Sequence, residues 1–221
     1  CQEEKRLRPM LLQETYRLFG GKSDIVEPFM AAIEMIHTYS LIHDDLPAMD
    51  NDEYRPGRKT THVVYGEAMA IRCRGRSAEL RLRNGPGSAE KRTGEYTDRT
   101  GLCILASRAG IYGMVGGQTV DVENEGKPLD KEKLNFIYEL KTGALIEGAM
   151  LIGAVLAGAT KNEQNTIQEV ARNVGLAFQI QDDILDVTST EEELGKPIHS
   201  DEKNHKTTYV TLMGIEKHHS R

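Results

Sequence analysis

Helix-like spacing of apolar residues dominates this chain. Apolar positions recur at intervals of three and four, the pattern of helices that bury one face. The segments with this pattern are 5–19, 25–46, 61–71, 104–122, 131–159 and 163–187. No strand-like alternation and no internal repeat stands out. The pattern therefore predicts an all-α protein.

Glycine, proline and polar residues separate these segments. Residues 20–24 form a predicted turn, Pro47 ends the helix over 25–46, and residues 51–60 form a polar loop. The other predicted breaks are 123–130, 158–162 and 188–208, and a helix fragment follows them at the end.

Residues 72–101 depart from this organisation. They are rich in arginine and have no sustained apolar face. An RNA-binding patch would use such arginines, but no aromatic platform accompanies them. We therefore expect either a disordered loop or a segment whose reading frame has been shifted.

Composition narrows the function classes. The chain has 221 residues and a net charge of −6, which argues against general nucleic-acid binding. Cys1, Cys73 and Cys103 show no metal or disulfide spacing, so we expect a reduced, cytoplasmic protein. The longest apolar run, 148–159, is too short for stable membrane insertion. Because the chain does not begin with methionine, we expect it to be incomplete.

Two aspartate clusters carry the candidate chemistry. Asp182, Asp183 and Asp186 are spaced so that all of them can share one helical face, where their charges repel. A second cluster, 43–50, reads HDDLPAMD at the end of another helical segment. Acidic groups on helices are commonly just solvated, but paired clusters of hard oxygen ligands suit Mg²⁺. We therefore expect a cavity between two helices with magnesium ions inside it.

These clusters belong to an ordered set of motifs. The set is KRLRP at 5–9, the first aspartate motif at 43–50, KTG at 141–143, DDILD at 182–186, and GK at 195–196 followed by Lys206. Together it resembles the trans-isoprenyl diphosphate synthases, most closely the bacterial farnesyl diphosphate synthases. The resemblance covers 5–71 and 104–217. It implies one prenyltransferase domain over 1–221, incomplete at both ends, folded as a single helical bundle around a central cavity.

The resemblance also implies roles for individual residues. The aspartates would hold about three Mg²⁺ ions on the allylic diphosphate; they are Asp44, Asp45, Asp50, Asp182, Asp183 and Asp186. Residues matching the isopentenyl diphosphate site are Lys5, Arg8 and His37. Residues matching the allylic diphosphate site are Arg55, Lys141, Thr142, Gln179 and Lys196, with Lys206 nearby. Taken singly, these would be ordinary surface cations, helix-interior residues or a packed histidine.

The implied reaction is a head-to-tail condensation of isopentenyl diphosphate with dimethylallyl or geranyl diphosphate. Tyr39 and Ser40 precede Asp44 by about one helical turn, where side chains of this family set product length. A tyrosine facing the growing chain favours farnesyl diphosphate, with geranylgeranyl diphosphate as the close alternative. Two further alternatives are a terpene cyclase and an inactive partner subunit, which have the same fold. The resemblance further implies a homodimer.

The chain departs from the family pattern in two places. Pro56 follows Arg55 where the family usually has a second arginine, which would weaken isopentenyl diphosphate binding. In 72–101 the family has a helix with a Gly-Asp-Ala-Leu-Leu-like start. Codons permitted for Arg74 to Glu90, read one base later, can encode such a helix. We therefore expect a frameshift beginning after Ile71.

Overall fold

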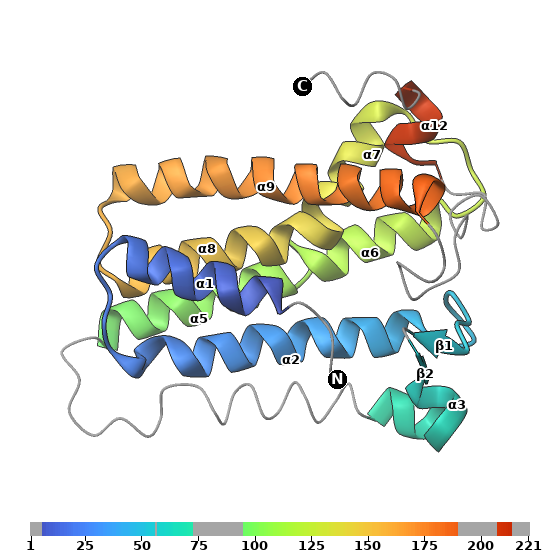
Figure 1. Ribbon diagram of the computed structural model, residues 1–221, viewed down its shortest axis with the longest axis horizontal. Coiled ribbons are helices and arrows are strands. Elements are labelled where there is room, and N and C mark those ends of the chain that lie inside the picture. The colour runs from blue at the N-terminus through green and yellow to red at the C-terminus, as the bar shows by residue number, and fades with distance from the viewer. Residues whose placement is uncertain (1–5, 56, 73–94, 190–206, 214–221) are drawn as a thin grey trace.

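Long helices lying side by side form an elongated bundle in the computed structural model, which describes residues 6–55, 57–72, 95–189 and 207–213 (Figure 1). The α-helices are α1 Leu7–Leu18, α2 Glu27–Asp44, α3 Thr61–Tyr65, α5 Glu95–Ala109, α6 Met114–Glu123, α7 Lys131–Ile137, α8 Ala144–Leu156, α9 Lys161–Thr188 and α12 Tyr209–Met213. The predicted all-α fold is confirmed. A small antiparallel ribbon, β1 Tyr54–Arg55 with β2 Arg58–Lys59, lies in the predicted loop. Two-residue strands are too short to leave an alternating pattern.

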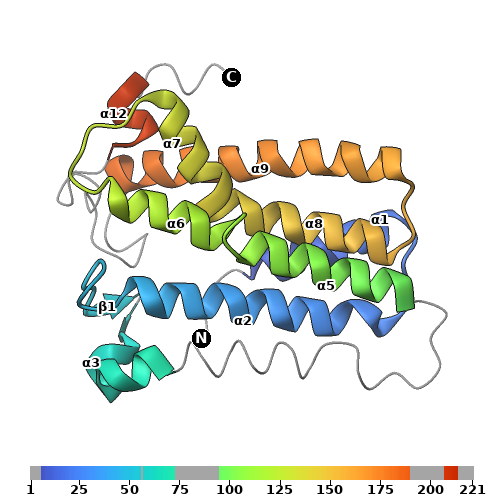
Figure 2. The same ribbon diagram turned by 180° about the vertical axis from the view of Figure 1, so that it is seen from behind.

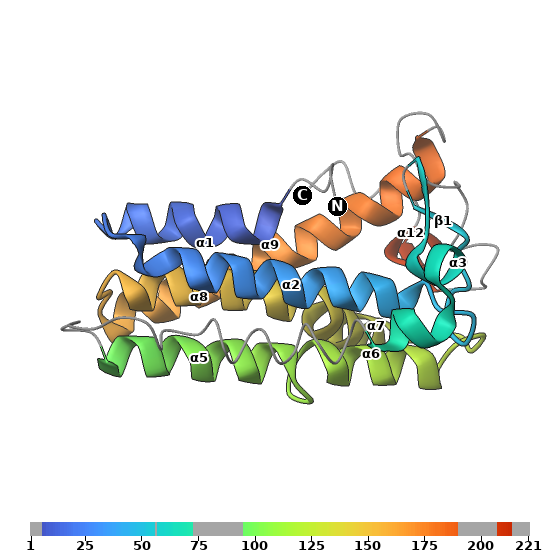
Figure 3. The same cartoon turned by 90° about the horizontal axis from the view of Figure 1, so that it is seen from below.

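Helix α8 forms the centre of the bundle. Its sequence is apolar on nearly every side, and it packs against α1, α5 and α9. The close approach of α1 depends on Gly153, since an added Cβ would lie 2.4 Å from the carbonyl oxygen of Leu12. Phe29, Ile33 and Ile36 of α2 belong to the same core. Seen from below, α1, α2 and α5 run roughly parallel to one another (Figure 3).

The helix predicted over 104–122 is instead two helices. Helix α5 ends at Ala109 and α6 begins at Met114, with a visible break between them (Figure 2). Gly113 permits this break because a Cβ there would lie 2.1 Å from the carbonyl oxygen of Arg108. Helix α5 also begins at Glu95, so residues 95–101 of the segment predicted to be anomalous are helical. The rest of that segment from 73 to 94 lies outside the described residues.

The helix predicted over 61–71 is interrupted at Gly66, whose φ of +84° ends α3 in a conformation that favours glycine. Residues 67–72 are helical again. The helix predicted over 131–159 is α7 followed by the π-helical turn η2 Tyr138–Gly143 and then α8. Helix α9 starts with a capping box, in which Thr160 and Glu163 satisfy each other's backbone N–H groups.

The turn η2 is enclosed by glycines on two neighbouring helices. A Cβ on Gly117 of α6 would lie 2.3 Å from the backbone nitrogen of Lys141, and a Cβ on Gly175 of α9 would lie 3.0 Å from Cα of Gly143. Single π-helical turns inside α-helices often occur at functional sites. Here the turn carries Lys141 and Thr142, both predicted to bind substrate.

One stretch within the described residues, Asp24–Asp44, is long and apolar enough to cross a membrane by length and composition alone. A core helix passes the same test. Phe29, Ile33 and Ile36 lie on this stretch and are almost fully buried against the rest of the bundle. The prediction of no stable membrane insertion remains a prediction.

Candidate active site

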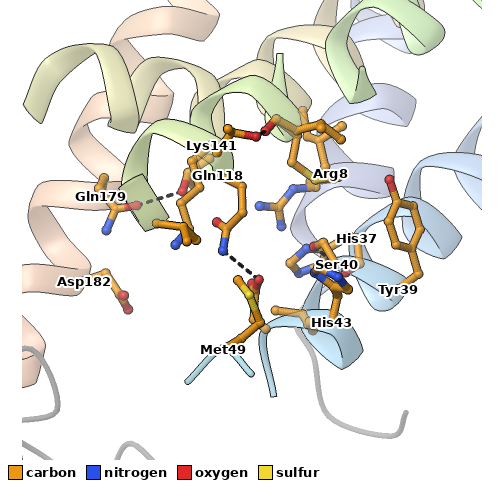
Figure 4. Close-up of a pocket in the computed structure, with 18 of the residues that line it drawn as sticks. Arg8, His37, Tyr39, Ser40, His43, Met49, Gln118, Lys141, Gln179 and Asp182 are labelled. Carbon is orange, nitrogen blue, oxygen red and sulfur yellow. Dashed lines mark hydrogen bonds between the residues drawn. The ribbon is translucent and has the colours of Figure 1, made fainter. Parts of the chain in front are cut away.

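A cavity of about 510 Å³ lies between α1, α2, α6, η2 and α9 (Figure 4). Residues from distant parts of the sequence meet in its walls. The predicted site residues that line it are Arg8, His37, Tyr39, Ser40, Asp44, Lys141, Thr142, Gln179 and Asp182. The fold therefore brings to one cavity one aspartate of each motif and members of both predicted substrate-binding sets.

The first aspartate motif divides between the cavity and the protein interior. Asp44, the last residue of α2, lines the cavity and accepts a hydrogen bond of 3.0 Å from Nε2 of Gln118. Asp45 is only 2% exposed, and the guanidinium of Arg55 donates to its Oδ1 at 2.7 Å. Burial raises the pKa of Asp45, and the charge of Arg55 opposes that rise.

Asp50 and Arg55 lie outside the cavity lining. Asp50 is exposed, and its backbone N–H donates to the carbonyl oxygen of Asp44 at 2.9 Å. Asn51, with φ of +53°, completes the turn that returns this loop toward α2. The loop therefore keeps Asp50 close to the end of α2, while Arg55 contacts Asp45 and the carbonyl oxygen of Leu41.

The second motif divides in the same way. Asp182 lines the cavity, whereas Asp183 and Asp186 are 3% and 2% exposed. We expected all of them on one helical face; the structure instead turns Asp183 and Asp186, three residues apart, toward the interior. Asp183 accepts hydrogen bonds from Tyr138 Oη at 2.7 Å and from the backbone N–H of Tyr209 at 2.9 Å. Burial raises its pKa, and these donors oppose the rise.

Magnesium fits the carboxylates of this cavity only when a ligand supplies more oxygens. Among the described residues, no group of acidic, histidine and cysteine side chains forms a complete metal site by itself. Asp44 and Asp182 nevertheless line one cavity from different helices. Mg²⁺ in phosphate-binding sites is typically held by one or two carboxylates, substrate phosphates and water. Asp44 and Asp182 fit that arrangement.

Cationic side chains accompany the aspartates. Arg8 of α1 is 8% exposed and lines the cavity, as does Lys141 of η2. Nζ of Lys141 donates to Oδ2 of Asp121 at 2.6 Å, which holds the ammonium group in place. The predicted substrate ligands Lys5, Lys196 and Lys206 lie outside the described residues, as does Pro56.

His37 is a neutral side chain in the cavity wall. Burial is the largest cause that lowers its pKa to about 3, and the positive charges of Arg8 and Arg55 contribute to the same shift. A neutral imidazole can donate one hydrogen bond and accept another. Its predicted contact with a diphosphate would therefore be a hydrogen bond and not an ion pair.

Sequence reasoning missed several residues that shape the site. Gln118 contacts Asp44, Asp121 contacts Lys141, and Tyr138 contacts Asp183. Gln118 and Asp121 are three residues apart in a helical segment, and this spacing is the signal that places both on one face. For Tyr138 the sequence holds no comparable signal, because its partner is on another helix.

Apolar residues complete the cavity. They come from α6, α8 and α9 and include Met114, Val115, Leu145 and Phe178. Pockets that bind small molecules are typically lined by such apolar side chains together with a few polar groups. The arrangement thus combines carboxylates, cations and an apolar compartment, which suits a ligand with a diphosphate head and a hydrocarbon tail.

Known proteins share this sequence and fold. A family profile described as polyprenyl synthetase matches residues 1–221. A farnesyl diphosphate synthase of Geobacillus stearothermophilus is 43% identical over 211 residues, covering 96% of this chain and 71% of that protein. A geranylgeranyl diphosphate synthase of Cyanophora paradoxa is 44% identical over 214 residues, covering 96% of this chain and 71% of that protein.

A solved structure agrees with these sequence matches. It is a geranyltransferase from Helicobacter pylori, complexed with magnesium and isoprenyl diphosphate. It superposes with a TM-score of 0.87 at 34% identity and covers 97% of this chain and 72% of that one. The cavity, its two aspartate motifs and these matches lead to one conclusion: the chain belongs to the polyprenyl synthetase family and is a prenyltransferase.

Proposed function

We propose that this prenyltransferase joins isopentenyl diphosphate head-to-tail to dimethylallyl or geranyl diphosphate, giving farnesyl diphosphate and inorganic diphosphate. The observation that supports this most is that Asp44 and Asp182, from separate motifs, line one cavity with Arg8 and Lys141. Isopentenyl diphosphate in that cavity would be near Arg8, and an allylic diphosphate would be near both carboxylates and Lys141. Its hydrocarbon tail would extend among the apolar residues.

Different residues of the chain would have different roles in this reaction. Asp44 and Asp182 would hold magnesium, which, when bound, neutralises charge on the departing diphosphate. Arg8 and Lys141 would donate hydrogen bonds to phosphate oxygens, and Lys141 is already oriented by Asp121. As the allylic C–O bond breaks, the double bond of isopentenyl diphosphate attacks and a C–C bond forms. The proton then lost passes to the released diphosphate.

Apolar walls protect the reactive carbon. Met114 and Leu145 lie in the cavity lining, and an allylic cation formed beside them is shielded from water. The chain itself therefore contributes positioning, charge and exclusion of water. No side chain is required to act as a general base.

Tyr39 is the proposed determinant of product length. It is 8% exposed, lines the cavity, and belongs to the hydrophobic core, so its ring has little room to move aside. Ser40 lies beside it and donates to the carbonyl oxygen of His37 at 2.8 Å. Geranylgeranyl diphosphate is the second candidate product, favoured by the geranylgeranyl diphosphate synthase relative that is 44% identical.

The metal content, the oligomeric state and the domain organisation also belong to this proposal. We infer that about three Mg²⁺ ions bind with substrate, that Asp45, Asp50, Asp183 and Asp186 support or complete their coordination, and that the protein is a cytoplasmic homodimer. We also infer one domain over 1–221. Light scattering of the purified protein and peptide mass mapping across 72–101 test the dimer and the suspected frameshift.

The direct test is an assay with radiolabelled isopentenyl diphosphate, each allylic partner, and Mg²⁺ present or absent. The proposal expects labelled farnesyl diphosphate only when both substrates and Mg²⁺ are present. An inactive partner subunit would give no labelled product. A terpene cyclase would instead convert farnesyl diphosphate alone into a cyclic hydrocarbon, and either result would overturn the proposal.

A further inference from the structure

Three elements meet at the carboxylate of Asp183. Tyr138 Oη, from η2, and the backbone N–H of Tyr209, from α12, both donate to the same atom, Oδ2, at 2.7 and 2.9 Å. Gln179, one helical turn earlier on α9, donates from Nε2 to Oδ1 at 3.4 Å. Since Asp183 is 3% exposed, these donors replace the water that a free carboxylate would bind.

The aromatic rings reinforce this junction. The ring centroids of Tyr138 and Tyr209 are 5.6 Å apart with an interplanar angle of 43°. Both tyrosines are buried in a small apolar cluster with Leu134 and Ile137 of α7. The junction, defined here as Tyr138, Asp183 and Tyr209, therefore fixes α12 against α9 and η2.

A short chain of hydrogen bonds connects the junction with the cavity. Gln179 donates to Asp183 and, through Oε1, accepts from Oγ1 of Thr142 at 2.8 Å. Gln179 and Thr142 both line the cavity, as does Asp182, the neighbour of Asp183. Figure 4 shows Gln179 and Asp182 on the same wall. The orientation of Asp183 thus bears on groups that would contact an allylic diphosphate.

We propose that Tyr138 is a positioning residue for the allylic diphosphate, acting through Asp183 to couple the docking of α12 to the orientation of Gln179 and Thr142. This inference rests on the proposed function of the cavity. The physical reason is that Oδ2 of Asp183 has donors from two elements. Without the Tyr138 hydroxyl, Oδ2 keeps the Tyr209 N–H and Oδ1 keeps the longer contact from Gln179. A buried carboxylate with fewer donors shifts toward other partners or water.

Tyr138→Phe tests the inference because it keeps the ring and removes only the hydroxyl. We expect the KM for the allylic diphosphate to rise about fivefold while the KM for isopentenyl diphosphate changes little. We also expect amide hydrogen exchange in Tyr209–Met213 to quicken about tenfold in the free protein. On an Asp183→Asn background, Tyr138→Phe should have no further effect on either quantity.

Tyr16→Phe is the matched control. Tyr16 is a 5% exposed tyrosine of α1 whose hydroxyl is 2.8 Å from Oγ of Ser23, away from the cavity lining. It should lower stability without changing the ratio of the two KM values. The inference is overturned if Tyr138→Phe changes both KM values equally or leaves α12 exchange unchanged. The exchange measurement needs no turnover, so it tests the junction even if the proposed reaction fails.

Discussion

Asp44 at the end of α2 and Asp182 on α9 line the same cavity, although they belong to motifs far apart in the sequence. Their neighbours Asp45 and Asp183 do not share this environment. Both are buried and already bound by donors from other elements. Each motif thus offers one carboxylate to a ligand and uses another to hold the surrounding structure together.

The Arg55–Asp45 ion pair should matter for stability. Arg55→Gln leaves Asp45, 2% exposed, without its cationic partner, so we expect the free energy of unfolding to fall by about 1–3 kcal/mol. Adding Asp45→Asn should recover much of the loss, because no buried charge then remains. Urea denaturation measures both effects.

Arg17→Gln is the matched control for this pair. Arg17 contacts Glu14 at 2.7 Å, but the side chains are 58% and 62% exposed, so the expected loss is about 0.5 kcal/mol or less. Equal losses for Arg17→Gln and Arg55→Gln would show that burial of Asp45 does not govern the effect.

The lowered pKa of His37 makes stability depend on pH. The folded protein keeps His37 neutral down to a pKa of about 3, whereas the unfolded chain protonates it near 6.5. The unfolded state therefore binds more protons in this window, and the free energy of unfolding should fall as pH falls from 6.5 toward 3.

His37→Asn should remove part of this dependence. Comparing both proteins by urea denaturation at pH 7.5 and 5 isolates the contribution of His37 from carboxylates, which titrate in both. We expect the wild-type protein to lose about 2 kcal/mol more than the variant over that range. Parallel pH curves would contradict a lowered pKa for this imidazole.

Gln118 should tune magnesium binding through Asp44. Gln118→Leu removes the donor that orients the Asp44 carboxylate, and loss of such an outer contact typically weakens metal binding about tenfold or more. We expect a higher Mg²⁺ concentration for half-maximal activity. Gln168→Leu is the control, since Gln168 contacts buried Glu147 outside the cavity lining. The same Mg²⁺ shift in both variants would contradict a role for the Asp44 contact.

Tyr39 should limit the growing chain by its volume. Tyr39→Ala removes the ring from the cavity wall, so the main product should shift from farnesyl to geranylgeranyl diphosphate or longer chains. Tyr39→Phe keeps the ring and should keep the product. Chromatography of dephosphorylated products measures the distribution. If Tyr39→Ala makes only farnesyl diphosphate, the length limit lies elsewhere.

The helices and the two motifs were predictable because apolar periodicity and aspartate clusters are local signals. They predicted a helix end near Pro47 and two motifs facing one cavity; α2 ends at Asp44, and Asp44 and Asp182 both line the cavity. The break between α5 and α6 was not predicted, since Gly113 acts through a contact with the backbone of Arg108. The presence of a glycine in the sequence does not tell whether it lies inside a packed helix or between two helices.

The sequence also could not predict which aspartates of DDILD face the cavity and which face the interior. Helical spacing allows Asp182, Asp183 and Asp186 to share a face, but the choice of direction depends on Tyr138 and Tyr209, which come from other elements. For the same reason Gln118 was missed. Its partner Asp44 is distant in the sequence, and only the packing of α6 near α2 brings them together.

The most direct test of the account is calorimetric titration of inorganic diphosphate into the wild-type protein, Asp44→Asn and Asp182→Asn, with and without Mg²⁺. Asp24→Asn, an exposed aspartate remote from the cavity lining, serves as control. We predict that the wild-type protein and the control bind diphosphate only with Mg²⁺, and that each cavity variant binds about tenfold more weakly or worse. Unchanged Mg²⁺-dependent affinity in both cavity variants would contradict a magnesium-diphosphate site between Asp44 and Asp182.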